Sequence, residues 1–353
     1  MAKPDRQEQS HAARSGGSLR IGMVGAGMIS QHHLIAWSRE PRARVVAICD
    51  PVLENARGRA EAFGIPACYC DLETMLAEQV LDAVDIASPR ETHVALVETA
   101  AAKGIDVLCQ KPLAPTLGAG IGLAERIAGR IRLMVHENWR FRPWYRQIKR
   151  WLDSDRAGDL LQVDMAMLSS GLLPDSAGRR PILERQPFMG REQRLMVAEV
   201  MIHHLDVLRW LFGPLTILGA RTAHTVPEVA GETLAAIFME TAAGVPIVLR
   251  GAMDAAGYPE KTLDRLEIVG NRASALLDGV DIRFIGAEAH QEKFDFARDY
   301  QASFDRVIAH FADGLILGTP FETDVTDNLE TLRLVEETYA MAERTSRGKA
   351  GLR

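Results

Sequence analysis

Lys111 has the residue type and the setting of a group that could transfer a proton. It follows Gln110 and precedes Pro112, directly after the apolar run 106–109. Such a run is typical of a buried strand, and α/β proteins bind ligands at the carboxyl ends of their parallel strands. A lysine held there could take a proton from a hydroxyl group while hydride leaves the carbon that carries it. The alternative is a solvated surface lysine before a proline.

An acid–histidine–acid series in a predicted helix offers a second set of groups. Glu199 and His203 are four residues apart and so share one helix face, which Asp206 extends. Polar groups among Met, Ile, Leu and Trp need partners or a purpose. His203 could relay a proton, whereas we expect His204 to be structural; a capped helix with exposed polar residues is the alternative. These residues could also bind a metal, but a lysine base needs none, and we predict none.

A glycine-rich turn near the start of the chain has the pattern of a phosphate-binding loop. The sequence Gly25-Ala26-Gly27-Met28-Ile29-Ser30 follows the apolar run 19–24 and opens a predicted helix. Gly25 would permit the tight turn, and Gly27 would let a pyrophosphate approach the N–H groups at the helix N-terminus. The pattern predicts a dinucleotide site that includes Met28 and Ile29.

Asp50 ends the next apolar run, about twenty residues beyond the glycine turn. Its carboxylate would accept hydrogen bonds from ribose hydroxyls and repel a 2′-phosphate, so we predict NAD in preference to NADP. Arg57 and Arg59, close downstream, weaken that preference. The alternative is a glycine turn without a ligand, followed by an aspartate that caps a helix.

Further polar residues follow other predicted strands and should reach the same edge of the sheet. After the run 83–87 the chain continues with Ser88, Pro89, Thr92 and His93, which we expect near the cofactor. After the run 132–137 it continues with Asn138, Trp139 and Arg140. We expect Asn138 and Trp139 to touch nicotinamide or substrate, and Arg140 either to contact substrate or to join the two domains.

The elements that must position these residues change character along the chain. Residues 19–137 alternate short apolar strands with helices, which predicts a parallel sheet covered on both faces. Residues 169–195 form a predicted irregular loop, and a helix is expected over 198–212. Six short strands then follow without helices between them, which indicates an antiparallel sheet, and helices over 300–317 and 324–344 close the chain.

Length and composition fit two soluble domains. The chain has 353 residues, 47% hydrophobic and 25% charged, and a net charge of -6 with no dominant basic stretch. Neither nucleic acid nor a membrane is therefore an expected partner. Four cysteines without zinc spacing are typical of the reducing cytoplasm. We expect a disordered tail over 1–18, a cofactor domain over 19–140 and a substrate-binding and oligomerisation domain over 141–353.

Together these motifs resemble the glucose–fructose oxidoreductase / inositol dehydrogenase / rhizopine catabolism (Gfo/Idh/MocA) family. The resemblance rests on the glycine turn, Asp50, residues 88–93, Gln110-Lys111-Pro112 and the series Glu199, His203, Asp206. It implies an α/β fold, with an N-terminal Rossmann parallel sheet and a C-terminal α/β domain that carries a large open, mainly antiparallel sheet. It also implies homodimers or homotetramers through that sheet, a final helix packed back on the Rossmann domain, Lys111 as the acid/base and His203 as its assistant.

Two departures from the family pattern affect the chemistry and the substrate. The family usually has Glu-Lys-Pro, whereas Gln110 precedes Lys111 here. A neutral neighbour stabilises the charge of Lys111 less than a carboxylate would, so we expect Lys111 to deprotonate more readily. Glu199 stands where an aspartate is usual, and this longer acid could shift the position of the substrate. The family pattern therefore does not define the identity of the substrate. The runs 136–145 and 184–188 resemble a subgroup that includes D-apiose and related pentose dehydrogenases.

The sequence therefore predicts an NAD-dependent dehydrogenase that acts on a sugar, polyol or cyclitol. The substrate-binding set is expected to comprise Lys111, Asn138, Trp139, Arg140, Glu199, His203 and Asp206. The expected catalytic residues are Lys111, His203 and Glu199, and Gln110, Lys111 and Asn138 are also expected to bind the cofactor. Lys111 and His203 should meet over the nicotinamide ring. One alternative is a glycosidase that retains NAD; the other is a sensor that binds NAD without catalysis.

Overall fold

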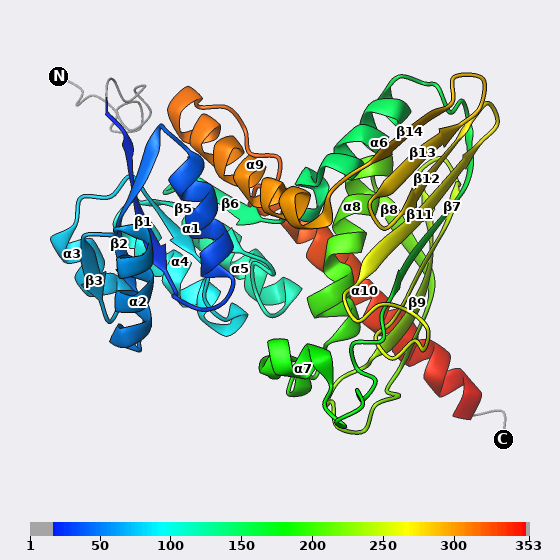
Figure 1. The fold of residues 1–353 in the computed structure, drawn as a ribbon, viewed down its shortest axis with the longest axis horizontal. Helices are drawn as coiled ribbons and strands as arrows, with labels where there is room; N and C mark the ends of the chain where they lie inside the picture. The colour runs from blue at the N-terminus through cyan, green and yellow to red at the C-terminus, as the bar shows by residue number, and fades with distance from the viewer. Residues whose placement is uncertain (1–16, 351–353) are drawn as a thin grey trace, which may run out of the picture. The chain divides into compact units, whose positions relative to one another are not determined.

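The computed structural model describes residues 17–350, which divide into two compact units (Figure 1). Among these residues the first unit spans 17–138 and 300–329, and the second spans 139–299 and 330–350. The expected N-terminal tail, residues 1–18, lies outside the described residues except for its last two positions.

The first unit is built on a six-stranded sheet whose neighbouring strands are all parallel. Its spatial order is β3-β2-β1-β4-β5-β6, with helices on both faces (Figure 1). The strands are β1 (Leu19–Val24), β2 (Ala43–Cys49), β3 (Ala67–Tyr69), β4 (Ala83–Ile86), β5 (Asp106–Gln110) and β6 (Leu133–His136). The helices are α1 (Ser30–Arg39), α2 (Leu53–Phe63), α3 (Leu72–Glu78), α4 (His93–Ala102) and α5 (Leu117–Ile127). The predicted parallel sheet is confirmed.

The strand order reverses beside β1. From β1 the chain moves outward to β2 and β3 on one side, and it then returns to add β4, β5 and β6 on the other. A reversal of this kind leaves a crevice at the carboxyl ends of the two central strands, where open α/β sheets bind ligands. The glycine turn follows β1 and Ser88 follows β4, so both lie at this reversal.

Residues 300–329 complete the first unit. They contain most of α9 (Phe296–Leu317) and the start of α10 (Val325–Ala350). Gln301 binds His32 of α1 through two contacts, one of 2.7 Å between the side chains and one of 3.0 Å to the His32 carbonyl. Thr323 donates to the carbonyl of Val135 in β6. The C-terminal segment is thus tied to both α1 and β6 of the unit.

The second unit is built on an eight-stranded sheet in the order β14-β13-β12-β11-β7-β10-β9-β8. Its strands are β7 (Leu160–Leu168), β8 (Leu215–Ala223), β9 (Leu234–Thr241), β10 (Pro246–Ala252), β11 (Leu263–Gly270), β12 (Ser274–Asp278), β13 (Asp281–Ile285) and β14 (His290–Lys293). All neighbours are antiparallel except β7 and β10. The mainly antiparallel sheet expected from the sequence is confirmed.

Helices cover one face of this sheet, as Figure 1 shows for α6 (Pro143–Asp153) and α8 (Ile202–Phe212). Buried and exposed residues alternate along β10, as they do when one sheet face packs on helices and the other faces outward. The outward set includes large apolar side chains, namely Leu218, Phe238, Val248, Leu263 and Ile285.

Some elements of the second unit differ from the sequence expectation. Helix α6 was not predicted, although Trp144, Ile148 and Trp151 recur at helical spacing and are buried. The loop expected over 169–195 contains a short helix, α7 (Pro181–Arg185). The prediction of a regular helix from Ala198 is wrong at its start, because Met196–Met201 forms a π-helical turn. In that turn the N–H groups of both Glu199 and Val200 donate to the Leu195 carbonyl.

Within residues 17–350 no helix combines the length and apolar character that a membrane crossing needs.

Candidate functional site

The glycine turn is shaped by a backbone that only glycine tolerates at its first position. Gly25 has a φ of 97°, and a Cβ placed there would lie 2.6 Å from the Ala87 carbonyl oxygen. A Cβ at Gly27 would meet nothing within 4 Å, so that backbone is open to an approaching group. The first residue of α1, Ser30, donates to the Gly27 carbonyl at 2.6 Å. The N–H groups that open α1 therefore face a space suited to a phosphate.

Asp50 binds the glycine turn from the end of β2. Its Oδ2 accepts the Ala26 N–H at 2.9 Å, and its Oδ1 accepts the Val52 N–H at 2.9 Å. A carboxylate has about four acceptor positions, so Asp50, which is only partly buried, retains capacity for ribose hydroxyls. The sequence did not reveal that the same residue also fixes the turn.

The two arginines downstream of Asp50 bind groups of the protein. Arg57 pairs with Glu54 at 2.6 Å on the surface. Arg59 donates to the Gly27 carbonyl at 3.1 Å and to the Gln31 side chain at 3.3 Å. Because Arg59 binds the turn itself, this geometry weakens the case for arginine recognition of a 2′-phosphate.

His93 connects the loops that follow β4 and β5. Its Nε2 lies 3.0 Å from the Ser88 carbonyl and its Nδ1 lies 2.8 Å from the Pro112 carbonyl. Burial lowers the pKa of His93, although the two carbonyls oppose this effect. Thr92 donates to the Pro89 carbonyl at 2.7 Å and its hydroxyl lies 2.7 Å from that of Ser88. These residues brace the edge of the sheet beside Lys111.

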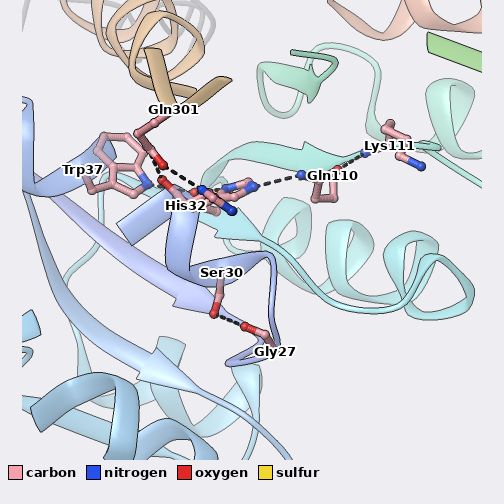
Figure 2. A network of polar contacts seen from close by, with 9 residues as sticks. Gly27, Ser30, His32, Trp37, Gln110, Lys111 and Gln301 are labelled. Atoms are coloured by element: carbon pink, nitrogen blue, oxygen red, sulfur yellow. Dashed lines mark hydrogen bonds and ion pairs between the residues drawn. The ribbon is translucent and has the colours of Figure 1, made fainter. Parts of the chain in front are cut away.

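Lys111 begins the loop at the end of β5 and is partly exposed. Its backbone N–H donates to the side-chain oxygen of Gln110 at 2.9 Å. The amide nitrogen of Gln110 lies 2.9 Å from Nε2 of His33. Figure 2 shows Gln110 between Lys111 and the polar network that extends toward Trp37. The backbone of Lys111 is therefore anchored to a buried hydrogen-bonded network through Gln110.

Asn138 ends the first unit just beyond β6. Its amide donates to the Ser303 hydroxyl at 2.8 Å, and it is 4% exposed. Ser303 in turn donates to the Tyr300 carbonyl at 2.6 Å. The sequence prediction that Asn138 contacts nicotinamide or substrate stays a prediction, but its side-chain orientation is set by α9.

The order of the strands places these groups along one edge. Asp50 follows β2, the glycine turn follows β1, Ser88 follows β4, and Lys111 follows β5. These strands are consecutive neighbours in the sheet, and three strand spacings amount to about 14 Å. A dinucleotide lying along the edge would run from a ribose at Asp50 to a reactive end at Lys111.

In the second unit, His203 stacks on Trp139. The ring centroids are 3.8 Å apart and the planes differ by 9°. The guanidinium carbon of Arg142 lies 3.3 Å from the centre of the Trp139 ring. Two planar groups this close to one ring cannot share a face, so Trp139 separates Arg142 from His203. His203 is 7% exposed.

Asp264 holds this stack in place. Its Oδ2 accepts hydrogen bonds from Trp139 Nε1 at 3.1 Å and Tyr145 Oη at 2.7 Å, and it lies 3.2 Å from Arg142. Its Oδ1 lies 2.8 Å from His204 Nε2. Burial by itself raises the pKa of Asp264, but His204, Arg142 and Tyr145 hold it well below its usual range. Burial raises the pKa of Tyr145 well above its usual value.

Arg140 and Asp206 form a buried pair with each other in the second unit. Two guanidinium nitrogens of Arg140 bind the two Asp206 oxygens, with 2.7 Å for the Nε contact. Thr331 donates to Asp206 at 3.1 Å. Arg140 and Asp206 are 1% and 0% exposed, and their expected contact with substrate stays a prediction. Glu199 is half-buried in the π-helical turn, a feature that is frequent at functional sites.

Each unit also contains buried polar residues that the sequence analysis did not single out. They are His33 and Asp85 in the first unit and Arg142 and Asp264 in the second. A charged residue inside the apolar strand Ala83–Ile86 was a signal for Asp85, because a buried carboxylate needs partners. Nothing comparable marked Asp264, whose partners come from segments far away in the chain.

Both units of the chain match one family. Residues 19–135 match the model described as an oxidoreductase family with an NAD-binding Rossmann fold, and residues 145–276 match the GFO/IDH/MocA C-terminal domain.

Curated relatives and solved structures extend the match over most of the chain. A D-apiose dehydrogenase of Paraburkholderia graminis is 33% identical over 91% of this chain and 86% of its own. An inositol 2-dehydrogenase of Saccharopolyspora erythraea is 30% identical over 85% of this chain and 86% of its own. An Agrobacterium radiobacter oxidoreductase, solved in complex with NAD+, L-tartaric acid and magnesium, has a TM-score of 0.85 and 26% identity, covering 92% of this chain and 96% of its own.

The match of residues 19–135 to an NAD-binding Rossmann model agrees with the six-stranded parallel sheet of the first unit. The chain belongs to the GFO/IDH/MocA family and is an NAD-dependent oxidoreductase.

Proposed function

We propose that this enzyme oxidises a hydroxyl-bearing carbon of a sugar, polyol or cyclitol, with Lys111 as the residue that takes the hydroxyl proton. The observation that carries the proposal is the position of Lys111, which follows β5 on the same sheet edge as the glycine turn after β1. Bound NAD would supply the hydride acceptor near Lys111, at the opposite end of that sheet edge from Asp50.

The described residues fit NAD in three respects. Gly27 and the N-terminus of α1 leave an open backbone for the pyrophosphate. Asp50 retains acceptor positions for ribose hydroxyls and would repel a 2′-phosphate. Met28 is 50% exposed, and a bound dinucleotide would cover such an apolar side chain at the turn. The preference for NAD over NADP follows from Asp50 together with the Arg59 contact to the turn.

The residues of the second unit support a substrate-binding role. His203, held flat by Trp139, is proposed to assist proton transfer, and Glu199 to bind substrate hydroxyls. Arg140 and Asp206 are proposed to position α8, because both are buried against each other. The relatives named for D-apiose and inositol support a polyhydroxylated substrate, and we include pentoses such as D-apiose in this class.

Assembly and location form a further part of the proposal. The outward apolar set of the eight-stranded sheet favours a homodimer or homotetramer through that sheet. All four cysteines are free thiols, which fits the reducing cytoplasm. Sedimentation velocity of the wild type and a Phe238→Glu variant tests the interface, since the charge should shift the enzyme to smaller species.

An activity screen tests the reaction. NADH absorbance would be followed with pentoses, hexoses and cyclitols, using NAD and NADP in parallel. Lys111→Ala should lose nearly all turnover and still bind NAD, whereas unchanged turnover would remove the mechanism. Cleavage of aryl glycosides without net NADH would indicate a glycosidase, and NAD binding without turnover of any substrate would indicate a sensor.

A further inference from the structure

Three buried side chains form a line of hydrogen bonds that ends on the backbone of Lys111. Asp85 Oδ2 lies 2.8 Å from His33 Nδ1, and His33 Nε2 lies 2.9 Å from Gln110 Nε2. Gln110 Oε1 accepts the Lys111 N–H at 2.9 Å. His33 and Asp85 are fully buried, and Gln110 is 8% exposed. The sequence motifs and the proposed chemistry account for none of these contacts.

The direction of every hydrogen bond in the line follows from the Lys111 N–H. A backbone N–H can only donate, so the atom of Gln110 facing it must be the oxygen. The amide nitrogen of Gln110 then faces His33, and His33 Nε2 must accept. Its proton therefore lies on Nδ1 and is donated to Asp85. The line requires His33 to be the neutral Nδ1–H tautomer.

The surroundings hold this line rigidly. Trp37 Nε1 donates to Asp85 Oδ2 at 2.8 Å. The His33 ring stacks on His136 of β6, with centroids 4.1 Å apart, and meets Phe304 of α9 at 5.6 Å. Asp85 and His136 are thus titratable groups that face His33. Buried polar groups that lose a partner are costly, so a fully paired line resists displacement.

We propose that His33 and Asp85 are positioning residues for Lys111 and that they select a neutral amide at position 110. A carboxylate at position 110 can only accept, so it would need a proton on His33 Nε2 and would convert His33 to the imidazolium form. The charge beside Lys111 and the protonation of His33 are therefore coupled through residue 110. This inference rests on the proposed function only in assigning the proton transfer to Lys111.

Nitrogen NMR of ring-¹⁵N-labelled histidine tests the line without any substrate. The His33 signals would be assigned by their loss in His33→Asn. Wild-type enzyme should show Nε2 unprotonated and Nδ1 protonated from pH 6 to 8. Gln110→Glu should protonate both nitrogens. A matched control is Gln301→Glu, which places a carboxylate beside His32 and should leave His33 unchanged. A protonated His33 Nε2 in the wild type would contradict the proposed hydrogen-bond directions. Unchanged His33 nitrogen signals in Gln110→Glu would contradict them as well.

Kinetics test the positioning role. His33→Phe keeps an aromatic ring but offers no acceptor, whereas His33→Gln can accept from Gln110 and donate to Asp85. His33→Phe should lower kcat about tenfold to a hundredfold with NAD affinity unchanged, because small misplacements of a reacting group have effects of this size. His33→Gln should restore most of the loss.

If His33→Phe folds and its kcat equals that of the wild type, His33 does not position Lys111. If His33→Phe does not fold, Gln110→Leu interrupts the line at its other end and should lower kcat in the same way; unchanged kcat in that variant also overturns the role. If Lys111→Ala retains turnover, the proposed function fails, while the NMR result still decides the protonation of His33.

Discussion

His203 lies flat against Trp139, with ring centroids 3.8 Å apart, and Trp139 Nε1 donates to Asp264 at 3.1 Å. The imidazole expected to assist catalysis is therefore oriented by an indole that a buried carboxylate holds in place. His203 and Trp139 are 64 residues apart in the numbering, so only folding brings them together.

Removing the stack should affect turnover through His203. We expect Trp139→Leu to lower kcat about tenfold or more, since acid–base assistance contributes about a hundredfold or more when intact. NAD affinity should not change, because the glycine turn belongs to the other unit. Steady-state kinetics with NADH absorbance measure the first effect and fluorescence titration the second. In the background of His203→Ala the same change should have little further effect; a full additional loss would contradict the link.

The Asp264 carboxylate should stabilise the second unit. Asp264→Asn removes the charge opposite Arg142, which is buried, and we expect a loss of about 3 kcal/mol in the free energy of unfolding. Urea denaturation measures it. Asp278→Asn, at the exposed pair with Arg265, is the control and should change little. Equal stability of both variants would refute the stabilising role of Asp264.

The same carboxylate should make stability depend on acid pH. Its pKa in the folded protein is lowered, so the unfolded chain binds a proton that the folded chain does not. The contribution is complete above the ordinary aspartate pKa of about 3.9 and is lost as pH falls below that value. Wild-type stability should therefore fall more steeply below about pH 4 than that of Asp264→Asn. Parallel pH profiles would show that Asp264 is not responsible.

Asp50 should decide both the affinity for NAD and the discrimination against NADP. Asp50→Ser loses hydrogen bonds to a charged group, each worth about 1.5–3 kcal/mol, so KM for NAD should rise about tenfold or more. The preference for NAD over NADP should fall with it, since the repulsion of a 2′-phosphate is gone. Asp71→Asn, which alters the cap of α3, is the control and should leave KM unchanged. An unaltered cofactor preference in Asp50→Ser would contradict the assignment.

Residue 110 should influence the pH dependence of turnover. A carboxylate at this position adjoins Lys111 in the chain, whereas the proton that it draws to His33 lies on the other side of residue 110. We therefore expect net stabilisation of the Lys111 ammonium, so Gln110→Glu should shift the acidic limb of the kcat profile to higher pH. The profile would be measured for the wild type and for Gln110→Glu with a saturating substrate. Gln301→Glu, which adds a carboxylate beside His32, should leave the profile unchanged. The idea fails if the Gln110→Glu profile stays in place or shifts downward.

Most helices and strands were predicted correctly from the order of apolar and polar residues along the chain. The six short strands expected after the helix over 198–212 are present as β8 to β13, and β14 follows them. The helix expected over 300–317 is α9, which ends at the same residue. Periodicity and capping depend on neighbours in the chain, and these are visible in the sequence. The π-helical turn at Met196–Met201 was not visible, because a widened turn has no distinct residue pattern.

The sequence by itself determined the family, the parallel sheet with its glycine turn, and the places of Asp50 and Lys111 at strand ends. These follow from the alternation of apolar runs and from residue types at their ends. Only the tertiary structure decided which side chains support them. The pairs His33 with Asp85 and Trp139 with Asp264 join residues 52 and 125 positions apart in the chain. Contacts of this kind depend on which strands become neighbours and which helices cover them, and local sequence does not encode either.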